Sequence, residues 1–328
     1  MTDTHHPHEA ALLVLIPCLN EEMTVGTVIS RIPRTIPGVS RIDVAVIDDG
    51  STDRTAEIAR RHGALVLRHG RNLGVGAALR TGLRHARLQG YAFVVNIDGD
   101  GQFAPEQIPA IAAPVIAGEA DIATASRFAD PALLPAMPAI KIWGNRRIAG
   151  LVSLMTGRRL HDVSCGFRAY SAEAVRALNL IGNFTYTHEV ILQACFQGFR
   201  VREVPVPVNG VREFGESRVA SNLFRYARLS SRIMFSSFFY FHPMRVFGMI
   251  ALVFLMPALA LGGFFLYHRL ATGEFTPHIW AGFAAAFLFV LGCMATMIGF
   301  IALLFQRLAT QLKQESDLIL DMVHRREG

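Results

Sequence analysis

The segment YAFVVNIDGDGQ, residues 91–102, decides what fold we expect for this chain. It begins as an apolar run, and two carboxylates, Asp98 and Asp100, follow directly. A short apolar run that ends abruptly in polar residues is typical of a buried strand in a parallel sheet. The segment therefore predicts a strand over 91–97 that delivers acidic side chains to the edge of a sheet.

Working outward from this segment, apolar runs alternate with stretches of helical spacing. The expected strands are 11–16, 43–47 and 64–67, and the expected helices are 22–31, 52–61 and 74–88. Short strands that alternate with helices indicate an α/β fold with a parallel, doubly wound sheet. The glycines at 74 and 76 resemble part of a dinucleotide fingerprint, but Leu79 stands where the third glycine belongs, so a Rossmann NAD site fits poorly.

In such sheets the ligand binds beyond the carboxyl ends of the strands. Here those ends carry Pro17 to Glu21, Asp48 to Ser51 and Asp98 to Gln102. Acidic clusters at neighbouring strand ends repel one another unless a cation or a donor-rich ligand lies between them. A nucleotide with a divalent metal supplies both.

The D-x-D sequence at residues 98–100 is weak evidence for a metal site by itself. It is stronger evidence here, because it follows an apolar strand. Asp98 and Asp100, with the amide oxygen of Gln102, suit Mg²⁺ or Mn²⁺. Asp48 and Asp49 are expected to accept hydrogen bonds from a base or a ribose. Ser51 and Asp53 are expected mainly to cap the following helix.

Composition excludes several protein classes. The chain has 328 residues, 52% of them hydrophobic and 18% charged, which excludes intrinsic disorder. Its four cysteines form no C-x-x-C, so neither a zinc site nor a redox pair is indicated. The net charge of +6 indicates an acidic partner.

The C-terminal part predicts a membrane hairpin. Residues 246–267 and 278–305 contain no Asp, Glu, Lys or Arg, and each run exceeds the ~20 residues that span a bilayer core. Basic residues flank both ends, whereas the linker carries only Arg269, which places both termini in the cytoplasm. Residues 218–241 read as an amphipathic helix in the headgroup layer. The polar N-terminus has no apolar core of a secretory signal.

Taken together, the motifs resemble the family 2 glycosyltransferases of GT-A fold, and within them the dolichyl-phosphate mannosyltransferase group of polyprenyl-phosphate glycosyltransferases. The resemblance covers about residues 11–220 and rests on six motifs: P-x-x-N-E at 17–21, D-D-G-S-x-D at 48–53, D-x-D-x-Q at 98–102, A-S-R at 125–127, C-G-F-R at 165–168 and R-x-x-G-x-S-R at 212–218. The chain departs from the group at four places. Gly99 replaces alanine, Cys165 replaces serine, Arg218 replaces lysine, and Cys18-Leu19 replaces a tyrosine-containing pair.

The resemblance implies transfer of a sugar from a nucleotide diphosphate sugar, of GDP-mannose or UDP-hexose type, to dolichyl or undecaprenyl phosphate with inversion. It implies a nucleotide site at Pro17, Asn20, Glu21, Asp48, Asp49 and Asp98. It implies a Mg²⁺ or Mn²⁺ held by Asp98, Asp100 and Gln102, and an acceptor-phosphate clamp of Arg127, Lys141, Arg168, Arg212 and Arg218. Asp98, Asp100, Arg127 and Asp162 are the expected catalytic set, and Asp162 is expected to orient an arginine rather than to act as a weak base.

The expected organisation is a disordered tail over 1–10, a GT-A catalytic domain over 11–218, an interfacial region over 219–243, the two spans within 244–306 and a cytoplasmic tail over 307–328. We expect an integral protein of the cytoplasmic membrane that binds no nucleic acid and whose helices could pair in a homo-oligomer. Two alternatives stay open. One is a catalytically inactive scaffold or sugar-nucleotide sensor, and the other is a glycosyltransferase that acts directly on a glycan or another lipid. A processive synthase is disfavoured, because neither tryptophan follows an arginine as a Q-x-x-R-W motif requires.

Overall fold

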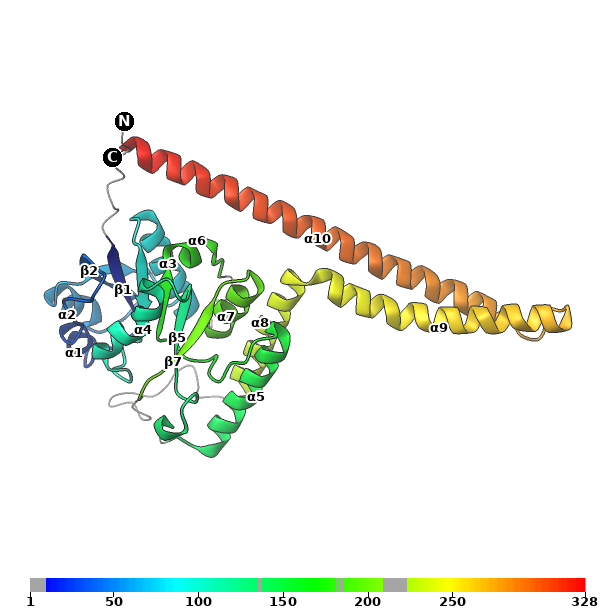
Figure 1. Ribbon diagram of the computed structural model, residues 1–328, viewed down its shortest axis with the longest axis horizontal. Helices are drawn as coiled ribbons and strands as arrows, with labels where there is room; N and C mark the ends of the chain where they lie inside the picture. Colours follow the sequence, from blue (N-terminus) through cyan, green and yellow to red (C-terminus); the bar gives the residue numbers. More distant parts are fainter. Residues whose placement is uncertain (1–9, 135–136, 181, 183–185, 209–222, 328) are drawn as a thin grey trace. The chain divides into compact units, whose positions relative to one another are not determined.

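The computed structural model describes residues 10–134, 137–180, 182, 186–208 and 223–327. The chain divides into two compact units, 1–235 and 236–328. The first unit holds a seven-stranded sheet, which Figure 1 shows surrounded by helices. Its strands are β1 (Ala11–Cys18), β2 (Arg41–Asp48), β3 (Leu65–Arg68), β4 (Phe93–Asn96), β5 (Ile122–Ser126), β6 (Arg168–Ser171) and β7 (Val201–Pro205).

The strand order is β3-β2-β1-β4-β6-β5-β7. Every pairing is parallel except those that β6 makes with β4 and β5. The predicted α/β fold with a mostly parallel sheet is therefore confirmed. Strand β1 runs through Pro17 to Cys18, two residues beyond the expected end. Pairing of β1 with β4 stops at Leu15, so Pro17 has no strand partner on its β4 side, and a missing N–H is tolerated on a side without a partner strand.

The helices of this unit cover both faces of the sheet. They are α1 (Val25–Ser30), α2 (Thr55–Arg61), α3 (Val75–Leu88), α4 (Ile108–Ile116), α5 (Ala139–Thr156), α6 (Ala172–Ala177) and α7 (Thr187–Phe196), with 3₁₀ turns at Pro105–Gln107 and Pro131–Leu133. Helix α8 (Leu223–Phe241) crosses from the first unit into the second.

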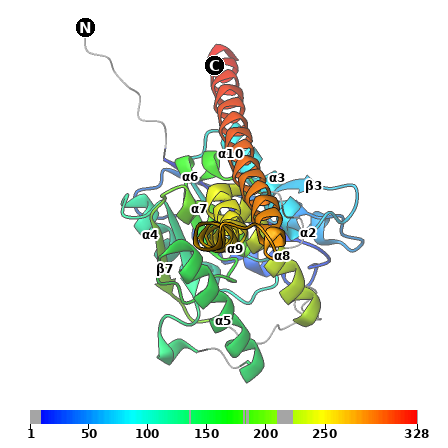
Figure 2. The same ribbon diagram turned by 90° about the vertical axis from the view of Figure 1, so that its right-hand side faces the viewer.

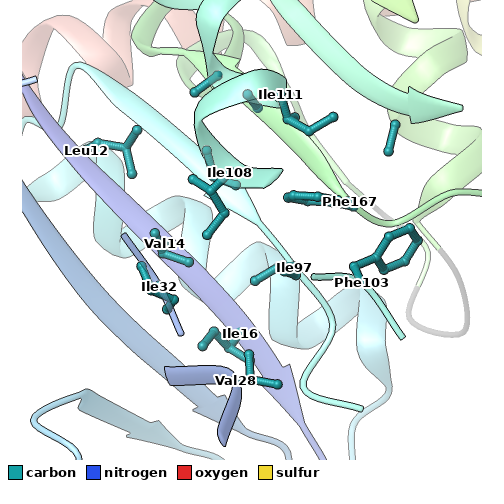
Figure 3. Close-up of a cluster of buried hydrophobic side chains, with 14 of the residues drawn as sticks. Leu12, Val14, Ile16, Val28, Ile32, Ile97, Phe103, Ile108, Ile111 and Phe167 are labelled. Carbon is teal, nitrogen blue, oxygen red and sulfur yellow. The ribbon is translucent and has the colours of Figure 1, made fainter. Parts of the chain in front are cut away.

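Alternation along β1 explains the two cores. Leu12, Val14 and Ile16 point to one face, where they pack with residues of α1 and α4 such as Val28 and Ile108 (Figure 3). Leu13 and Leu15 point to the opposite face and pack with residues of α3 and α7. Because successive side chains of a strand alternate between faces, a strand that is apolar throughout must be covered on both sides. The sheet is thus held between two helical layers, and its strand ends stay open for a site.

The second unit contains α9 (Pro243–Thr272) and α10 (Ile279–Glu327), which pack against each other. Both are long and apolar enough to cross a membrane, and only 11% and 17% of their most apolar windows are buried. Small residues bring the two helices close together. A Cβ at Gly292 would lie 2.6 Å from Leu255, and one at Gly299 would lie 2.8 Å from Phe247. The backbone of α10 continues as helix through the segment 307–327 that the sequence assigned to a tail.

Candidate active site

The carboxyl ends of β1, β2 and β4 bring the three polar motifs to one edge of the sheet. Cys18 of β1 is in register with Asp48 of β2, and Leu15 of β1 is in register with Asn96 of β4. The residues that follow these positions are Leu19 to Glu21, Asp49 to Ser51 and Asp98 to Gln102. The expected convergence of the motifs at one edge is therefore what the strand register produces.

Hydrogen bonds lock the first two motifs together. Asn20 has a positive φ of 54°, and its N–H donates to Ser51 Oγ at 2.9 Å. Its side-chain oxygen accepts from the Thr52 N–H at 2.8 Å. The Asn20 side chain thus ties the loop after β1 to the loop after β2. Ser51 serves this junction and does not cap α2. Asp53 lies one residue before the N-cap Arg54, and its Oδ1 accepts the N–H of Thr55, the first residue of α2, at 3.0 Å.

Asp48 and Asp49 are both buried, and each has internal partners. Asp48 Oδ1 accepts the Ser51 N–H at 2.8 Å, and its Oδ2 lies 3.0 Å from Arg68 Nε. Asp49 accepts the N–H groups of Leu73 and Gly74 and lies 2.7 Å from His69 Nδ1. Because an ionised carboxylate only accepts, this His69 nitrogen carries the proton. Asp49 therefore braces the 69–74 loop ahead of α3, and its assignment to nucleotide binding stays a prediction.

An open pocket of about 380 Å³ lies next to this pair of strand ends. Arg68 forms one of its walls, with its side chain 54% exposed, while its Nη2 donates to the Ser51 carbonyl at 2.8 Å. The pocket has the size of a small-molecule site, although it is shallow. Its lining residues are Gly50, Ser51, Thr52, Arg68, His69 and Gly70.

The acidic motif after β4 lies close to the first two. Burial raises the pKa of the Cys18 thiol well above its usual value, and the carboxylates of Glu21, Asp48, Asp98 and Asp100 raise it further. The buried Cys18 sulfur therefore lies close enough to interact electrostatically with acidic residues from all three loops. Asp100 is 3% exposed, and its Oδ1 accepts the Gln102 N–H at 3.0 Å. The structure brings Asp98 and Asp100 of the predicted metal set together with Glu21 and Asp48 of the predicted nucleotide set.

Two glycines keep space open around these carboxylates. A Cβ at Gly166 would lie 2.7 Å from the Tyr186 hydroxyl and 3.1 Å from Asp98 Oδ2. A Cβ at Gly99 would lie only 2.5 Å from Cys18 Sγ. The two sequence departures at 18 and 99 are therefore neighbours in space, because the thiol occupies the volume that an alanine at 99 would need.

Within the described residues there is no group of three or more His, Cys, Asp or Glu side chains that could hold a metal alone. The donor set nevertheless suits Mg²⁺ or Mn²⁺, which proteins commonly bind through one or two carboxylates while substrate phosphates and water complete the shell. Asp98 and Asp100 supply two hard oxygen donors, and the Gly166 position leaves Asp98 approachable.

At the end of β5, Arg127 forms a bidentate pair with Asp162. Its Nε donates to Asp162 Oδ2 at 2.6 Å and its Nη2 donates to Oδ1 at 3.0 Å. Burial by itself raises the pKa of Asp162, but the Arg127 guanidinium and backbone donors outweigh burial and hold that pKa below its usual range. A carboxylate with a lowered pKa is a poor base and a good anchor. Asp162 thus pairs with both edges of the Arg127 guanidinium, and its role in the reaction stays a prediction.

Glu203 of β7, which the sequence did not single out, supports this pair. Its Oε1 accepts the Asp162 N–H at 2.7 Å and the Ser126 hydroxyl at 3.1 Å, and its Oε2 lies 2.7 Å from His161 Nδ1. Ser126 precedes Arg127, so one carboxylate fixes both chain segments that carry the pair. Its partners lie 41, 77 and 42 residues away in sequence, and no local pattern could reveal them.

The rest of the expected cationic clamp is placed differently. Arg168 is fully buried in β6, where its Nε donates to Thr124 Oγ1 at 3.3 Å and its Nη2 donates to the Val163 carbonyl at 3.2 Å. Its assignment to an acceptor phosphate is not supported by this position, because the guanidinium serves the interior of the sheet. Lys141 belongs to the backbone of α5, and its side chain is not described. Arg212 and Arg218 lie outside the described residues.

Comparison with known proteins places this geometry in context. A family model described as Glycosyl transferase family 2 matches residues 13–178. The polyprenol monophosphomannose synthase of Mycolicibacterium smegmatis is 28% identical over 66% of this chain and 83% of its own length. The dolichyl-phosphate hexose transferase of Haloferax volcanii is 31% identical over 60% of this chain and 82% of its own length.

Among solved structures, glucosyl-3-phosphoglycerate synthase from Mycobacterium tuberculosis, in complex with Mn²⁺, uridine diphosphate and glucosyl-3-phosphoglycerate, is similar in fold. The TM-score is 0.54 at 20% identity, and the match covers 71% of this chain and 80% of that chain. At this identity the similarity concerns the fold alone.

Proposed function

Because the chain belongs to glycosyltransferase family 2, we propose that it moves a sugar from a nucleoside diphosphate sugar to a polyprenyl phosphate at a membrane. The observation that carries the proposal is the placement of an acidic and a cationic group at one sheet edge. Asn96 of β4 and Thr124 of β5 both pair with Arg168 of β6, so the two strands run parallel at the same level. Asp98 and Arg127 therefore leave the sheet at the same edge, two strand spacings or about 10 Å apart.

That spacing suits a reaction between two phosphorylated substrates. We assign the diphosphate of the donor to the β4 end, where Asp98, Asp100 and Gln102 would hold the divalent cation. Bound there, the cation would neutralise the charge that develops on the departing nucleoside diphosphate. The open pocket beside Arg68 lies next to Asp48 and is the assigned place for the nucleoside.

The acceptor end needs a positioned cation rather than a strong base. A phosphate monoester is already ionised at neutral pH, so its oxygen attacks without first losing a proton to the protein. Arg127 can hold and aim that phosphate, and Asp162 keeps the guanidinium plane fixed. With nucleophile and leaving group on opposite sides of the anomeric carbon, a single in-line displacement inverts the configuration.

The relatives support this choice of acceptor. The relative from M. smegmatis is a polyprenol monophosphomannose synthase, and the relative from H. volcanii is a dolichyl-phosphate hexose transferase. The two long apolar helices α9 and α10 would keep the catalytic unit at the membrane where such a lipid resides, and the flanking basic residues favour a cytoplasmic active site. The proposed organisation keeps the expected boundaries at 11–218 for the catalytic domain and 244–306 for the spans.

The test is a screen of nucleotide sugars against polyprenyl phosphates with the full chain in detergent or liposomes. Radiolabelled sugar should move into an organic-extractable lipid with Mn²⁺ or Mg²⁺, and chelation should abolish the transfer. A catalytically inactive scaffold would transfer no label with any donor. A sensor would show a nucleotide-dependent rise in melting temperature without transfer of label. Label that appears in a water-soluble glycan would identify the glycan, and not the lipid, as the acceptor.

A further inference from the structure

Beneath the carboxyl end of β4, the apolar core contains a buried polar pair, Asn96 and Tyr186. Asn96 is the last residue of β4 and is fully buried, and Tyr186, the N-cap residue of α7, is 2% exposed. The start of α7, a helix labelled in Figures 1 and 2, brings Tyr186 to the sheet face on which Val94 packs. Because side chains alternate along a strand, Asn96 lies on the same face as Val94. Burial of an amide and a phenol in such a core is unfavourable unless both are hydrogen-bonded.

Donor and acceptor chemistry fixes the direction of the hydrogen bonds in this pair. Asn96 Nδ2 lies 2.8 Å from the Gly166 carbonyl oxygen and 2.7 Å from the Tyr186 hydroxyl oxygen. A carbonyl only accepts, so the amide nitrogen faces it, and the second N–H of that nitrogen donates to Tyr186. The tyrosine oxygen is therefore the acceptor in this contact, and its own proton points elsewhere. The Gly166 carbonyl is a poor acceptor for that proton, because it lies 3.5 Å away and already accepts from Asn96.

The Asp98 carboxylate is a strong acceptor beside the Tyr186 hydroxyl. Gly166 lies between the two groups: a Cβ at this glycine would be 2.7 Å from the hydroxyl oxygen, 3.1 Å from Asp98 Oδ2 and 3.2 Å from Oδ1. The hydroxyl and the carboxylate thus face the same small space, which the missing side chain of Gly166 leaves open. Burial and, next, the negative charge of Asp98 raise the pKa of Tyr186 well above its usual value, so the phenol keeps its proton and stays a donor.

We propose that Tyr186 is a positioning residue for Asp98, and that its hydroxyl donates to this carboxylate and orients it toward the divalent cation. The inference rests on the proposed role of Asp98 as a metal ligand. A carboxylate held by a directional donor presents its lone pairs to the cation in a fixed direction, and outer partners of this kind commonly change metal affinity by about 10–100-fold. Asn96 completes the arrangement, because its N–H binds the tyrosine oxygen and turns the hydroxyl proton away from the amide.

Titration of the full chain in detergent with Mn²⁺ alone tests this role, and electron paramagnetic resonance measures the free ion. Tyr186→Phe removes the hydroxyl and keeps the ring, so the Kd for Mn²⁺ should rise about 10–100-fold. Tyr170→Phe is the matched control and should leave the Kd unchanged. Tyr170 is an equally buried tyrosine of the same core, but its hydroxyl interacts with Arg168.

Melting temperatures measured without metal separate positioning from folding. Tyr186→Phe leaves one N–H of Asn96 without its acceptor, so its melting temperature should fall by a few degrees. Val175→Ala, which removes apolar volume from the same core, should also lower the melting temperature but leave the Kd for Mn²⁺ unchanged. An equal rise of the Kd in Val175→Ala, or an unchanged Kd in Tyr186→Phe, would overturn the positioning role, while Mn²⁺ binding by the parent would leave the metal assignment standing. A parent chain that binds no Mn²⁺ would overturn the metal assignment and this inference together.

Discussion

Replacing Asp162 by asparagine removes one negative charge and almost no volume from the Arg127 pair. Asp162 is fully buried and the Arg127 side chain is 19% exposed, so the substitution leaves a largely buried guanidinium without its counter-charge. Breaking a buried pair costs about 3–5 kcal/mol, and the partial exposure of Arg127 places the expected cost near the lower end, at about 3 kcal/mol. For a domain of this size the melting temperature should fall by roughly 6–12 °C.

The same substitution should change catalysis at the acceptor rather than at the donor. Once Arg127 can rotate, the KM for polyprenyl phosphate should rise about tenfold or more, while the KM for the nucleotide sugar stays within about twofold. Thermal unfolding in detergent and initial rates at varied acceptor measure both effects. Asp121→Asn is the matched control, because Asp121 makes an equivalent pair with Arg200, whose side chain is 58% exposed, and such pairs contribute at most about 1 kcal/mol.

The pH dependence follows from the sign of the shift. Asp162 has a lowered pKa in the folded protein, so its stabilising effect is complete above its unfolded pKa of about 3.9 and is lost as the pH falls through the lower folded value. The difference between the parent and Asp162→Asn should therefore be constant from pH 6 to 8. An unchanged melting temperature together with an unchanged acceptor KM would mean that Asp162 neither stabilises the fold nor positions Arg127.

Three further substitutions test other parts of the account. Gly99→Ala should lower the free energy of unfolding by about 1–3 kcal/mol, because the new Cβ would overlap Cys18 Sγ. In a Cys18→Ala background, most of that loss should disappear. A double-mutant cycle measured by thermal shift that shows no coupling between the two positions would contradict the contact. Glu203→Gln should lower the free energy of unfolding by about 1.5–3 kcal/mol, because the amide loses the charge-assisted hydrogen bonds that Glu203 accepts from Asp162 and Ser126. It should raise the KM for the acceptor but not the KM for the donor. Equal changes in both KM values in steady-state rates would mean a general structural role. Gly292→Leu should lower the melting temperature in detergent, because the new side chain would overlap Leu255. Gly263→Leu is the control and should not lower it, because the space around Gly263 is open. Equal melting temperatures for the two variants would contradict the close packing of α9 on α10.

The fold was predictable because its information is local. Strand β1 is apolar throughout, and β2 and β4 are apolar over 44–47 and 93–95, so their buried parts have no other place in a water-exposed domain than a sheet covered on both faces. Strand β6 had no such mark. It is four residues long, begins with Arg168 and runs antiparallel, so its sequence read as a motif and not as part of a sheet.

The site was predictable in part. Asp48, Asp98 and Asp100 could be identified as site residues because they lie at the ends of predicted strands. A parallel sheet brings those ends together. What each carboxylate binds depends on contacts distant in sequence. Asp49 serves the 69–74 loop and Arg168 serves the sheet interior, and neither partner is visible from the motif itself.

In the proposed reaction, carboxylates at the end of β4 hold a metal-bound donor, and the acceptor is a lipid phosphate. The most direct measurement is Mn²⁺-dependent transfer of labelled sugar to polyprenyl phosphate by the parent, by Asp100→Asn and by Glu106→Gln, an exposed acid downstream that pairs with Arg31. We expect Asp100→Asn to lose transfer by about 10²-fold or more with an unchanged melting temperature in the absence of metal, and Glu106→Gln to keep full activity. Undiminished transfer by Asp100→Asn would contradict the proposed reaction.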